Sequence, residues 1–341
     1  MNGLHEIHKK IKQNKLAPVY VLYGQEEFLI EETVNLIINA ALSIEEREFN
    51  LSLFDMNEVP IDVAIEDAET LPFMGDKRVV IIKDPVFFTG NKDKTKVEHD
   101  LKRLEQFLDS PSPDAIVIFT GNYDKLDERK KIVKLLKKNG EVIQVSLMDG
   151  KAISAWIKNR VTKVDKEIDE EAIHLLLQLV GPKLMLLANE IEKLILYIGE
   201  DTKIDSSVIH NLVPRTLEQN VFALIDMIVK RRTRDALLFF YDLLEQKEEP
   251  IKILSLLAGQ FRLIYQVKEL YKRGYGQNQT GTYLKVHPYR VKLAGEQASK
   301  FSEIELQQIM NDLAEIDYKM KTGKMDKKLL IELFILQLNK N

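Results

Sequence analysis

The chain has 341 residues, of which 45% are hydrophobic and 30% charged, and it contains no cysteine. This length predicts two or three domains, and this composition is typical of a globular, helix-rich protein. The absence of cysteine excludes disulfides, thiolate metal sites and a cysteine nucleophile, and it fits a reducing cytoplasm. No apolar run approaches the roughly 18 residues of a membrane-spanning helix, and the charged first residues do not resemble a signal peptide. We therefore expect a cytoplasmic protein with no membrane partner.

The formal net charge of -4 hides a strong asymmetry along the chain. Residues 24–76 contain 14 acidic side chains and a single basic one, Arg47. Residues 251–300 contain nine Lys or Arg against two Glu. A polyanion is repelled by the first segment and attracted by the second, so the second is the plausible side for nucleic acid.

Five short apolar runs predict buried strands in the first part of the chain. They lie at residues 19–23, 48–55, 78–82, 115–119 and 142–145. Between them, apolar residues three and four apart predict helices after Gly24 and over residues 61–70, 97–108 and 126–138. Strands that alternate with helices indicate a parallel sheet covered on both faces.

Beyond about Ser146 the strand pattern ends and helical spacing continues to the last residues. Helices over 153–161 and 184–198 predict a small helical domain, and Pro214 indicates a break after it. The following expected helices lie at 221–230, 236–244, 253–271, 304–320 and 329–338. The predicted domains are therefore an α/β domain over 1–145, a small helical domain over 146–213 and a second helical domain over 214–341.

A strand that ends at a glycine before a helix is where an NTPase places its phosphate-binding loop, G-x-x-x-x-G-K-[ST]. The corresponding segment here reads Gly24-Gln25-Glu26-Glu27-Phe28-Leu29-Ile30, without the second glycine, the lysine or the hydroxyl residue. Each carboxylate about 4 Å from a phosphate would repel it by roughly 1 kcal/mol even in water. We expect no nucleotide or other cofactor here. An ordinary strand and helix with no lost function explains the glycine equally well.

Other catalytic patterns are missing from the sequence. The six histidines (5, 8, 99, 174, 210 and 287) are scattered, and no pair with metal-ligand spacing or nucleophile motif occurs. We therefore expect no catalytic residue, no metal site and no enzymatic activity.

An apolar turn precedes the strand at 78–82. It reads Leu71-Pro72-Phe73-Met74-Gly75-Asp76-Lys77-Arg78, with large apolar side chains bracketed by proline and glycine. Turns lie on protein surfaces, and apolar groups held there are typical of a plug for a partner's pocket. The alternative is that Phe73 and Met74 fold back onto the core of their own domain.

Three segments together resemble the delta subunit of the bacterial DNA polymerase III clamp loader. They are residues 19–24 followed by an acidic helix, residues 71–80, and Gly181 followed by Asn189-Glu190-Ile191-Glu192-Lys193-Leu194. The resemblance covers essentially the whole chain. It implies an AAA+-like α/β domain without ATPase activity, a small helical lid domain and a helical collar. Active members carry an arginine after the lid glycine, whereas Gly181 is followed by Pro182-Lys183-Leu184-Met185.

The resemblance also implies a function and partners. In that family, a hydrophobic pair on the turn after the second helix inserts into the sliding clamp (beta subunit) and opens one interface of the ring. The matching positions here are Leu71, Pro72, Phe73 and Met74. They differ from the Leu-Phe pair of some members, which leaves open which neighbour joins Phe73. The implied further partners are tau/gamma-type and delta-prime-type subunits and primed DNA.

Basic and aromatic side chains recur at helical spacing in the second helical domain. They are Arg262, Tyr265, Lys268, Lys272 and Arg273. This pattern suits phosphates and stacked bases, while a solvated face that meets acidic neighbours in an assembly explains it equally well.

The sequence as a whole predicts a non-catalytic clamp-loader subunit that binds and opens the sliding clamp. Two rivals belong to other classes. One is a P-loop-related, nucleotide-dependent enzyme with a divergent loop, and the other is a helical scaffold unrelated to replication.

Overall fold

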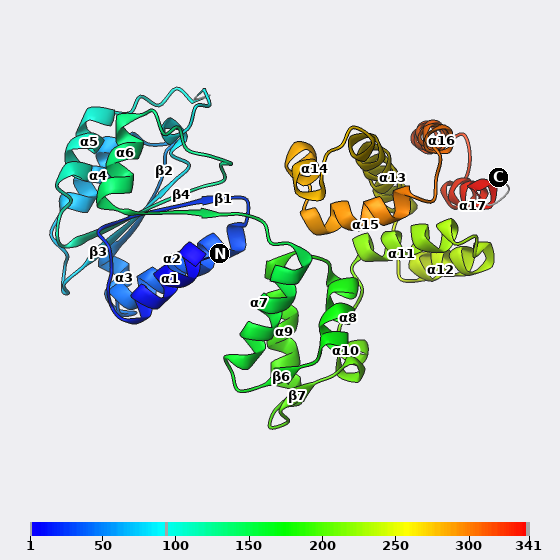
Figure 1. The fold of residues 1–341 in the computed structure, drawn as a ribbon, viewed down its shortest axis with the longest axis horizontal. Helices are drawn as coiled ribbons and strands as arrows, with labels where there is room; N and C mark the ends of the chain where they lie inside the picture. The colour runs from blue at the N-terminus through cyan, green and yellow to red at the C-terminus, as the bar shows by residue number, and fades with distance from the viewer. Residues whose placement is uncertain (1, 93–94, 339–341) are drawn as a thin grey trace. The chain divides into compact units, whose positions relative to one another are not determined.

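The computed structural model describes residues 2–92 and 95–338. The chain divides into two compact units, Met1–Leu147 and Met148–Asn341 (Figure 1). The first is an α/β unit and the second is mainly helical, so the predicted fold class is confirmed. The finer division of the second unit near residue 213 stays a prediction.

The first unit is built on a parallel five-stranded sheet with strand order β2-β3-β4-β1-β5. Its strands are β1 Val19–Gly24, β2 Leu51–Asp55, β3 Arg78–Lys83, β4 Ala115–Gly121 and β5 Glu141–Val145. The central strands are apolar at nearly every position because helices cover both faces of the sheet. Val79 to Ile82 in β3 and Ala115 to Phe119 in β4 are accordingly buried.

The helices of this unit pack in two groups. Helices α4 (Ile61–Glu69), α5 (Leu101–Asp109) and α6 (Lys131–Asn139) cover one face, and α1 (Asn2–Lys12) and α2 (Glu27–Ala41) cover the other (Figure 1). A short helix, α3 (Arg47–Asn50), precedes β2, and a 3-10 turn over Val86–Phe88 follows β3. All five strands run in the same direction, so loops that precede strands and loops that follow them lie at opposite edges of the sheet.

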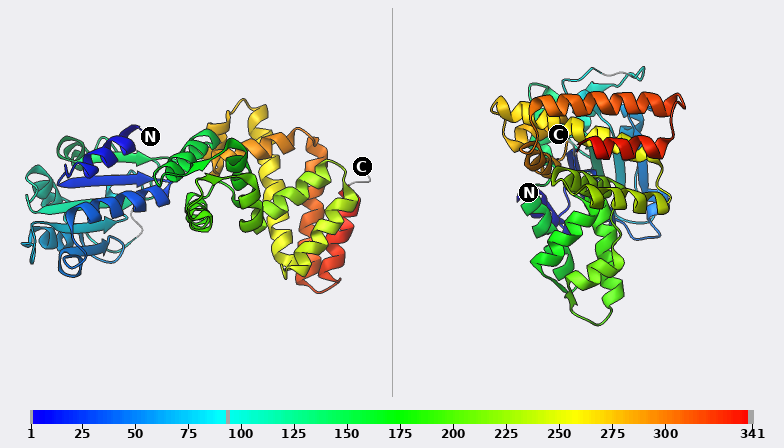
Figure 2. Two further views of the ribbon diagram at one scale, coloured as in Figure 1. Left: turned by 90° about the horizontal axis from the view of Figure 1, so that it is seen from below. Right: turned by 90° about the vertical axis from the view of Figure 1, so that its right-hand side faces the viewer.

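The second unit consists of eleven helices in the part of the chain that is described, with one pair of two-residue parallel strands, β6 (Glu167–Ile168) and β7 (Lys203–Ile204). The helices are α7 Gly150–Thr162, α8 Glu170–Val180, α9 Leu184–Ile198, α10 Ser206–Leu212, α11 Leu217–Val229, α12 Thr233–Glu245, α13 Pro250–Lys272, α14 Gln277–Leu284, α15 Pro288–Ala298, α16 Glu303–Lys321 and α17 Lys327–Leu338. Helix α13 is central and packs against α11, α15, α16 and α17. Figure 2 shows α16 and α17, orange and red, side by side.

Aspartate caps begin three helices of this unit. Asp149, Asp169 and Asp205 each accept backbone N–H bonds from the first turn of α7, α8 and α10. A side chain that accepts these otherwise unpaired donors stabilises a helix start by about 1 kcal/mol.

Several expected boundaries were wrong. The strand expected from residue 48 begins at Leu51, because residues 47–50 form α3. The helix expected from residue 97 begins at Leu101, because Asp100 caps it by accepting from the backbone of Lys102 and Arg103. The helix expected from residue 126 begins at Lys131. The purely helical pattern predicted beyond residue 146 missed β6 and β7, and α8, α10, α14 and α15 were not foreseen.

Across residues 2–92 and 95–338, no helix has both the length and the apolar character required to cross a bilayer.

Candidate functional site

The turn between α4 and β3 exposes large apolar side chains. Leu71 is 76% exposed, Phe73 57% and Met74 76%, while Pro72 is half-buried. These fractions decide between the two readings of the turn. The expectation that Phe73 and Met74 fold onto the core of their own domain is wrong, because solvent reaches most of each side chain.

A buried asparagine holds the backbone of this turn. Asn50, the last residue of α3, is fully buried and accepts a hydrogen bond at Oδ1 from the Phe73 N–H at 2.7 Å. Its Nδ2 donates to the Phe73 carbonyl oxygen at 2.8 Å. The side chain of Asn50 thus mimics a strand partner for one residue of the turn, and the turn has a fixed shape without regular secondary structure.

The backbone of the turn requires a glycine at its tip. Met74 has φ 54° and Gly75 has φ 138°, and the second value lies where residues with a Cβ are strained. A Cβ at Gly75 would also lie 2.1 Å from Oε1 of Glu46, the residue before α3. The sequence Met74-Gly75 therefore turns the chain back toward β3 and leaves Phe73 and Met74 outside.

One ion pair and two hydrogen bonds to backbone carbonyl oxygens fix the turn to the rest of its unit. Arg78, the first residue of β3, pairs with Asp67 of α4 and donates to the Phe49 carbonyl oxygen at 3.2 Å. Lys77 donates to the Pro113 carbonyl oxygen at 2.6 Å. The turn and α3 are thereby held together where β2 and β3 begin.

Phe49 is an additional apolar residue of this surface that the sequence did not reveal. It lies in α3, is 51% exposed, and its ring centroid is 5.1 Å from that of Phe73. Its place in an apparently continuous strand pattern gave no signal that it was exposed. We call Phe49, Leu71, Phe73 and Met74 the apolar loop surface.

Replacing Asn50 with alanine is expected to destabilise the first unit by about 2 kcal/mol, because the buried hydrogen bonds to Phe73 are lost and a cavity remains. Chemical denaturation followed by circular dichroism measures this difference. Asn35→Ala is the matched control, since Asn35 is an exposed asparagine on α2. Equal stability of the two variants would show that Asn50 does not hold the turn.

The Gly24 turn lies at the opposite edge of the sheet. Gly24 has φ 140°, and a Cβ there would lie 2.1 Å from the Val145 carbonyl oxygen at the end of β5. The side chain of Gln25 donates to Asp124 Oδ1 at 2.6 Å, and Gln144 donates to the Asp124 carbonyl oxygen at 2.7 Å. The turn is therefore packed directly against the end of β5 and the chain that follows β4.

Two carboxyl groups occupy the start of α2. Glu26 is only 7% exposed, and burial together with the neighbouring Glu27 raises its pKa to about 7. Glu27 accepts a hydrogen bond from Asn122 Nδ2 at 2.9 Å. A phosphate that approached this helix start would therefore meet carboxyl groups rather than cations.

Among the described residues, no three His, Asp or Glu side chains lie close enough together to hold a metal ion.

Of the five basic and aromatic candidates for DNA binding, four lie on α13 and Arg273 follows its last residue, but three of the five are held by neighbours in their own unit. Lys268 donates to the Ala298 carbonyl oxygen at 3.1 Å, Lys272 pairs with Glu303 at 2.6 Å, and Arg273 lies 3.7 Å from Glu269. Arg262 is exposed and Tyr265 is half-buried. Arg262 is thus the candidate with the most freedom to reach a ligand.

Two protein-family models match the chain. Residues 20–146 match the DNA polymerase III delta subunit, and residues 218–338 match the C-terminal domain of that subunit. The parallel α/β unit and the helical unit that follows it are therefore the two parts of a delta-type replication protein.

Known relatives agree with this class. The chain is 47% identical over 335 residues to DNA polymerase III subunit delta of Bacillus subtilis, with 98% of this chain and 96% of the relative covered. It is 22% identical over 267 residues to the probable delta subunit of Aquifex aeolicus, covering 75% and 72% of the two chains. The chain belongs to the DNA polymerase III delta subunit family, as the resemblance predicted.

A solved structure shares the fold over the full length. The Bacillus subtilis DNA clamp loader delta protein matches with a TM-score of 0.86 and 47% identity, and 99% of this chain and 100% of that chain are covered.

Proposed function

We propose that this delta subunit is a non-catalytic member of the clamp loader that binds the sliding clamp through its apolar loop surface and opens the ring for loading on primed DNA. The observation that carries the proposal is the exposure of Leu71, Phe73 and Met74 on a turn whose backbone is fixed by buried Asn50. Exposed apolar groups on a preformed turn are costly in water and favourable in a partner's pocket.

The energies are sufficient for this task. Burial of one Phe or Met side chain contributes about 1.5 to 3 kcal/mol. Because the hydrogen bonds of Asn50 fix the turn in advance, little of this energy is lost in ordering the loop. A subunit that binds the open ring more tightly than the closed ring shifts the equilibrium toward the open ring by that difference.

The Gly24 turn supports a role without nucleotide chemistry. Its buried Glu26 and its contact with the end of β5 leave a helix start that repels phosphate. In this proposal, ATP is bound by neighbouring subunits of the clamp loader. This chain joins tau/gamma-type and delta-prime-type subunits through its helical unit. The same proposal divides the second unit into a lid over 146–213 and a collar over 214–341. It also places the protein in the cytoplasmic replisome.

Primed DNA is the further proposed partner, and Arg262 is the best placed of the α13 candidates. Arg262→Gln is expected to reduce the salt slope of DNA binding by about one, since one phosphate contact is lost. Fluorescence anisotropy with labelled primed DNA at several salt concentrations measures the slope. An unchanged slope would remove Arg262 from the DNA contact.

Surface plasmon resonance with the immobilised sliding clamp of the same organism tests the proposed function. We expect saturable binding without ATP and with weak dependence on salt, because the contact is apolar. Failure to bind the clamp would overturn the proposal. ATP hydrolysis by the purified chain would instead favour the nucleotide-dependent enzyme.

A further inference from the structure

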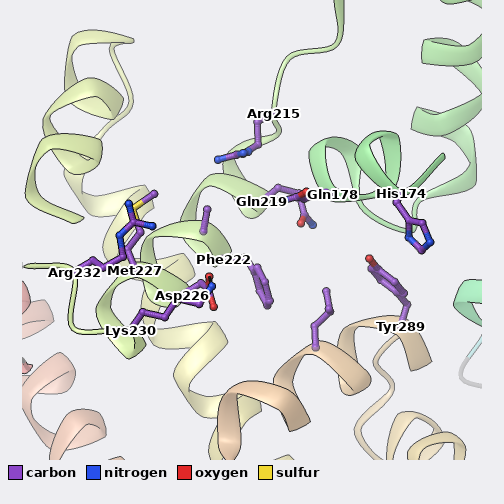
Figure 3. A pocket seen from close by; sticks show the side chains of 12 residues that line it. His174, Gln178, Arg215, Gln219, Phe222, Asp226, Met227, Lys230, Arg232 and Tyr289 are labelled. Carbon is purple, nitrogen blue, oxygen red and sulfur yellow. Dashed lines mark hydrogen bonds and ion pairs between the residues drawn. The ribbon is translucent and has the colours of Figure 1, made fainter. Parts of the chain in front are cut away.

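A cavity of about 410 Å³ lies within the second unit, whereas the apolar loop surface and the Gly24 turn belong to the first (Figure 3). Its walls come from α8, α11 and α15, from Arg215 in the segment before α11, and from Lys230 and Arg232 between α11 and α12. This volume lies within the range of about 300 to 1,000 Å³ that is typical of small-ligand sites.

A hydrogen bond and an ion pair hold together the part of the cavity wall that is formed by the end of α8 and the start of α11. The Thr216 N–H donates to the Leu179 carbonyl oxygen at 2.9 Å, and Lys183 pairs with Glu218 at 2.9 Å. Gly181 has φ 85°, and a Cβ there would lie 2.8 Å from Nε2 of Gln219. The glycine therefore makes room for the Gln219 side chain, which lines the cavity.

Polar side chains at one end of the cavity have free hydrogen-bonding groups. Within residues 2–92 and 95–338, the side chains of His174, Gln178, Gln219 and Tyr289 make no hydrogen bond to protein. Figure 3 shows the Gln178 and Gln219 side chains in the same part of its view and the His174 ring facing Tyr289. Amides offer both donors and acceptors, which are the groups that pair with the edge of a nucleobase.

Two basic side chains, Lys230 and Arg232, line another part of the cavity. Lys230 pairs with Asp226 at 2.7 Å and Arg232 with Asp235 at 2.6 Å, but both cationic side chains are about 60% exposed. Exposed pairs of this kind are worth at most about 1 kcal/mol, so a phosphate can displace the carboxylates.

Arg215 is the cation best suited to a ligand. Its guanidinium lies 5.9 Å from the ring centroid of Phe239, and it forms no ion pair with another residue in the described part of the chain. A guanidinium without a carboxylate can donate two parallel hydrogen bonds to a phosphate.

An apolar floor joins the two ends. Phe222, Met227 and Leu293 line the cavity, and in the view of Figure 3 Phe222 lies between Tyr289 and Lys230, below the amides and Arg215. We propose that this cavity binds a nucleoside phosphate, with the base over Phe222 beside the Gln178 and Gln219 amides and the phosphate at Arg215. The ligand is either a free nucleotide or one nucleotide of a nucleic acid strand, since both carry this chemistry.

Isothermal titration calorimetry of the full chain with ADP, and separately with a short oligodeoxyadenylate, tests the site. We expect saturable binding of at least one probe, weakened about 10-fold by Arg215→Gln because a charge-assisted phosphate contact is lost. Arg234→Gln is the matched control, since Arg234 is exposed on α12 and does not line the cavity. Gln178→Leu is expected to weaken the same probe, which tests the base end independently.

The two probes separate the sources of the ligand. Binding of ADP indicates a free nucleotide, and binding of the oligonucleotide alone indicates a strand. Absence of binding by both probes, or equal weakening by Arg215→Gln and Arg234→Gln, overturns the site. Clamp binding is expected to be unchanged in Arg215→Gln, so failure here is distinguishable from failure of the proposed function.

Discussion

Replacing Phe73 and Met74 together with alanine is expected to lower affinity for the sliding clamp at least about 100-fold. Each side chain contributes about 1.5 to 3 kcal/mol when buried, and every 1.4 kcal/mol is tenfold in affinity. Both side chains are more than half exposed in the free protein, so their removal is expected to leave its stability nearly unchanged. Surface plasmon resonance gives the affinities, and thermal denaturation checks that the variant is folded.

A matched control uses a second exposed apolar pair. Leu196 and Tyr197 on α9 are 81% and 61% exposed and lie in the other unit. Leu196→Ala with Tyr197→Ala removes similar apolar area and is expected to bind the clamp like the wild type. Equal affinity of the Phe73/Met74 variant and the wild type would place the clamp contact elsewhere, and equal loss in both variants would indicate nonspecific apolar association.

Much of the sheet could be predicted from sequence because its signals are local. Strands β1, β3 and β4 are continuous apolar runs ended by a glycine, a lysine or a polar residue, so their existence could be read from a few neighbouring residues. The order of the strands in the sheet was not predicted, because it depends on contacts between distant segments. The turn at Pro72 and Gly75 was recognisable for the same reason, since both residues restrict the backbone locally.

The support beneath the turn could not be predicted because it depends on a contact between distant segments. Asn50 is separated from Phe73 by 23 residues, and it is buried only because α3 folds beneath the turn. In the sequence it stands at the start of an apolar run and was assigned to a strand. The exposure of Phe49 depends on the same arrangement.

Helix α14 was missed for another physical reason. The first half of α14 reads Gln277-Asn278-Gln279-Thr280, which has no apolar spacing to indicate a helix. Its buried residues are Thr280 and Gly281, and Gly281 lies so close to the Val286 carbonyl oxygen that a Cβ would come within 2.9 Å. Close approach of backbone therefore accounts for the buried part of this helix, and Leu284 at its end adds a single apolar contact with the core.

The Gly24 turn was recognised in part. The residue types showed that it lacks the signature of a phosphate-binding loop. However, Glu26 and Glu27 were both expected to face the position that a phosphate would occupy. The structure instead buries Glu26, and burial raises its pKa to about 7. This difference changes the expected behaviour of the turn with pH.

Glu26→Gln is expected to stabilise the protein by roughly 3 kcal/mol at pH 8 and by less than about 1 kcal/mol at pH 5. In the unfolded chain Glu26 ionises near its ordinary pKa of 4.5, whereas in the folded protein it ionises near 7. Because the folded pKa is the higher one, stability is lost as pH rises from about 4.5 to 7, and the loss stays constant above that range. Glutamine retains the shape of the side chain and cannot ionise.

Chemical denaturation at both pH values measures this difference, with Glu31→Gln, an exposed glutamate on α2, as the matched control. A gain of the same size at pH 5 and pH 8 would assign the effect to hydrogen bonding by the new amide. No gain at pH 8 would show that the buried carboxylate ionises at no cost. The expected result, a gain confined to high pH, would establish that an uncompensated acid occupies the start of α2, where a nucleotide-binding protein needs a site that attracts phosphate.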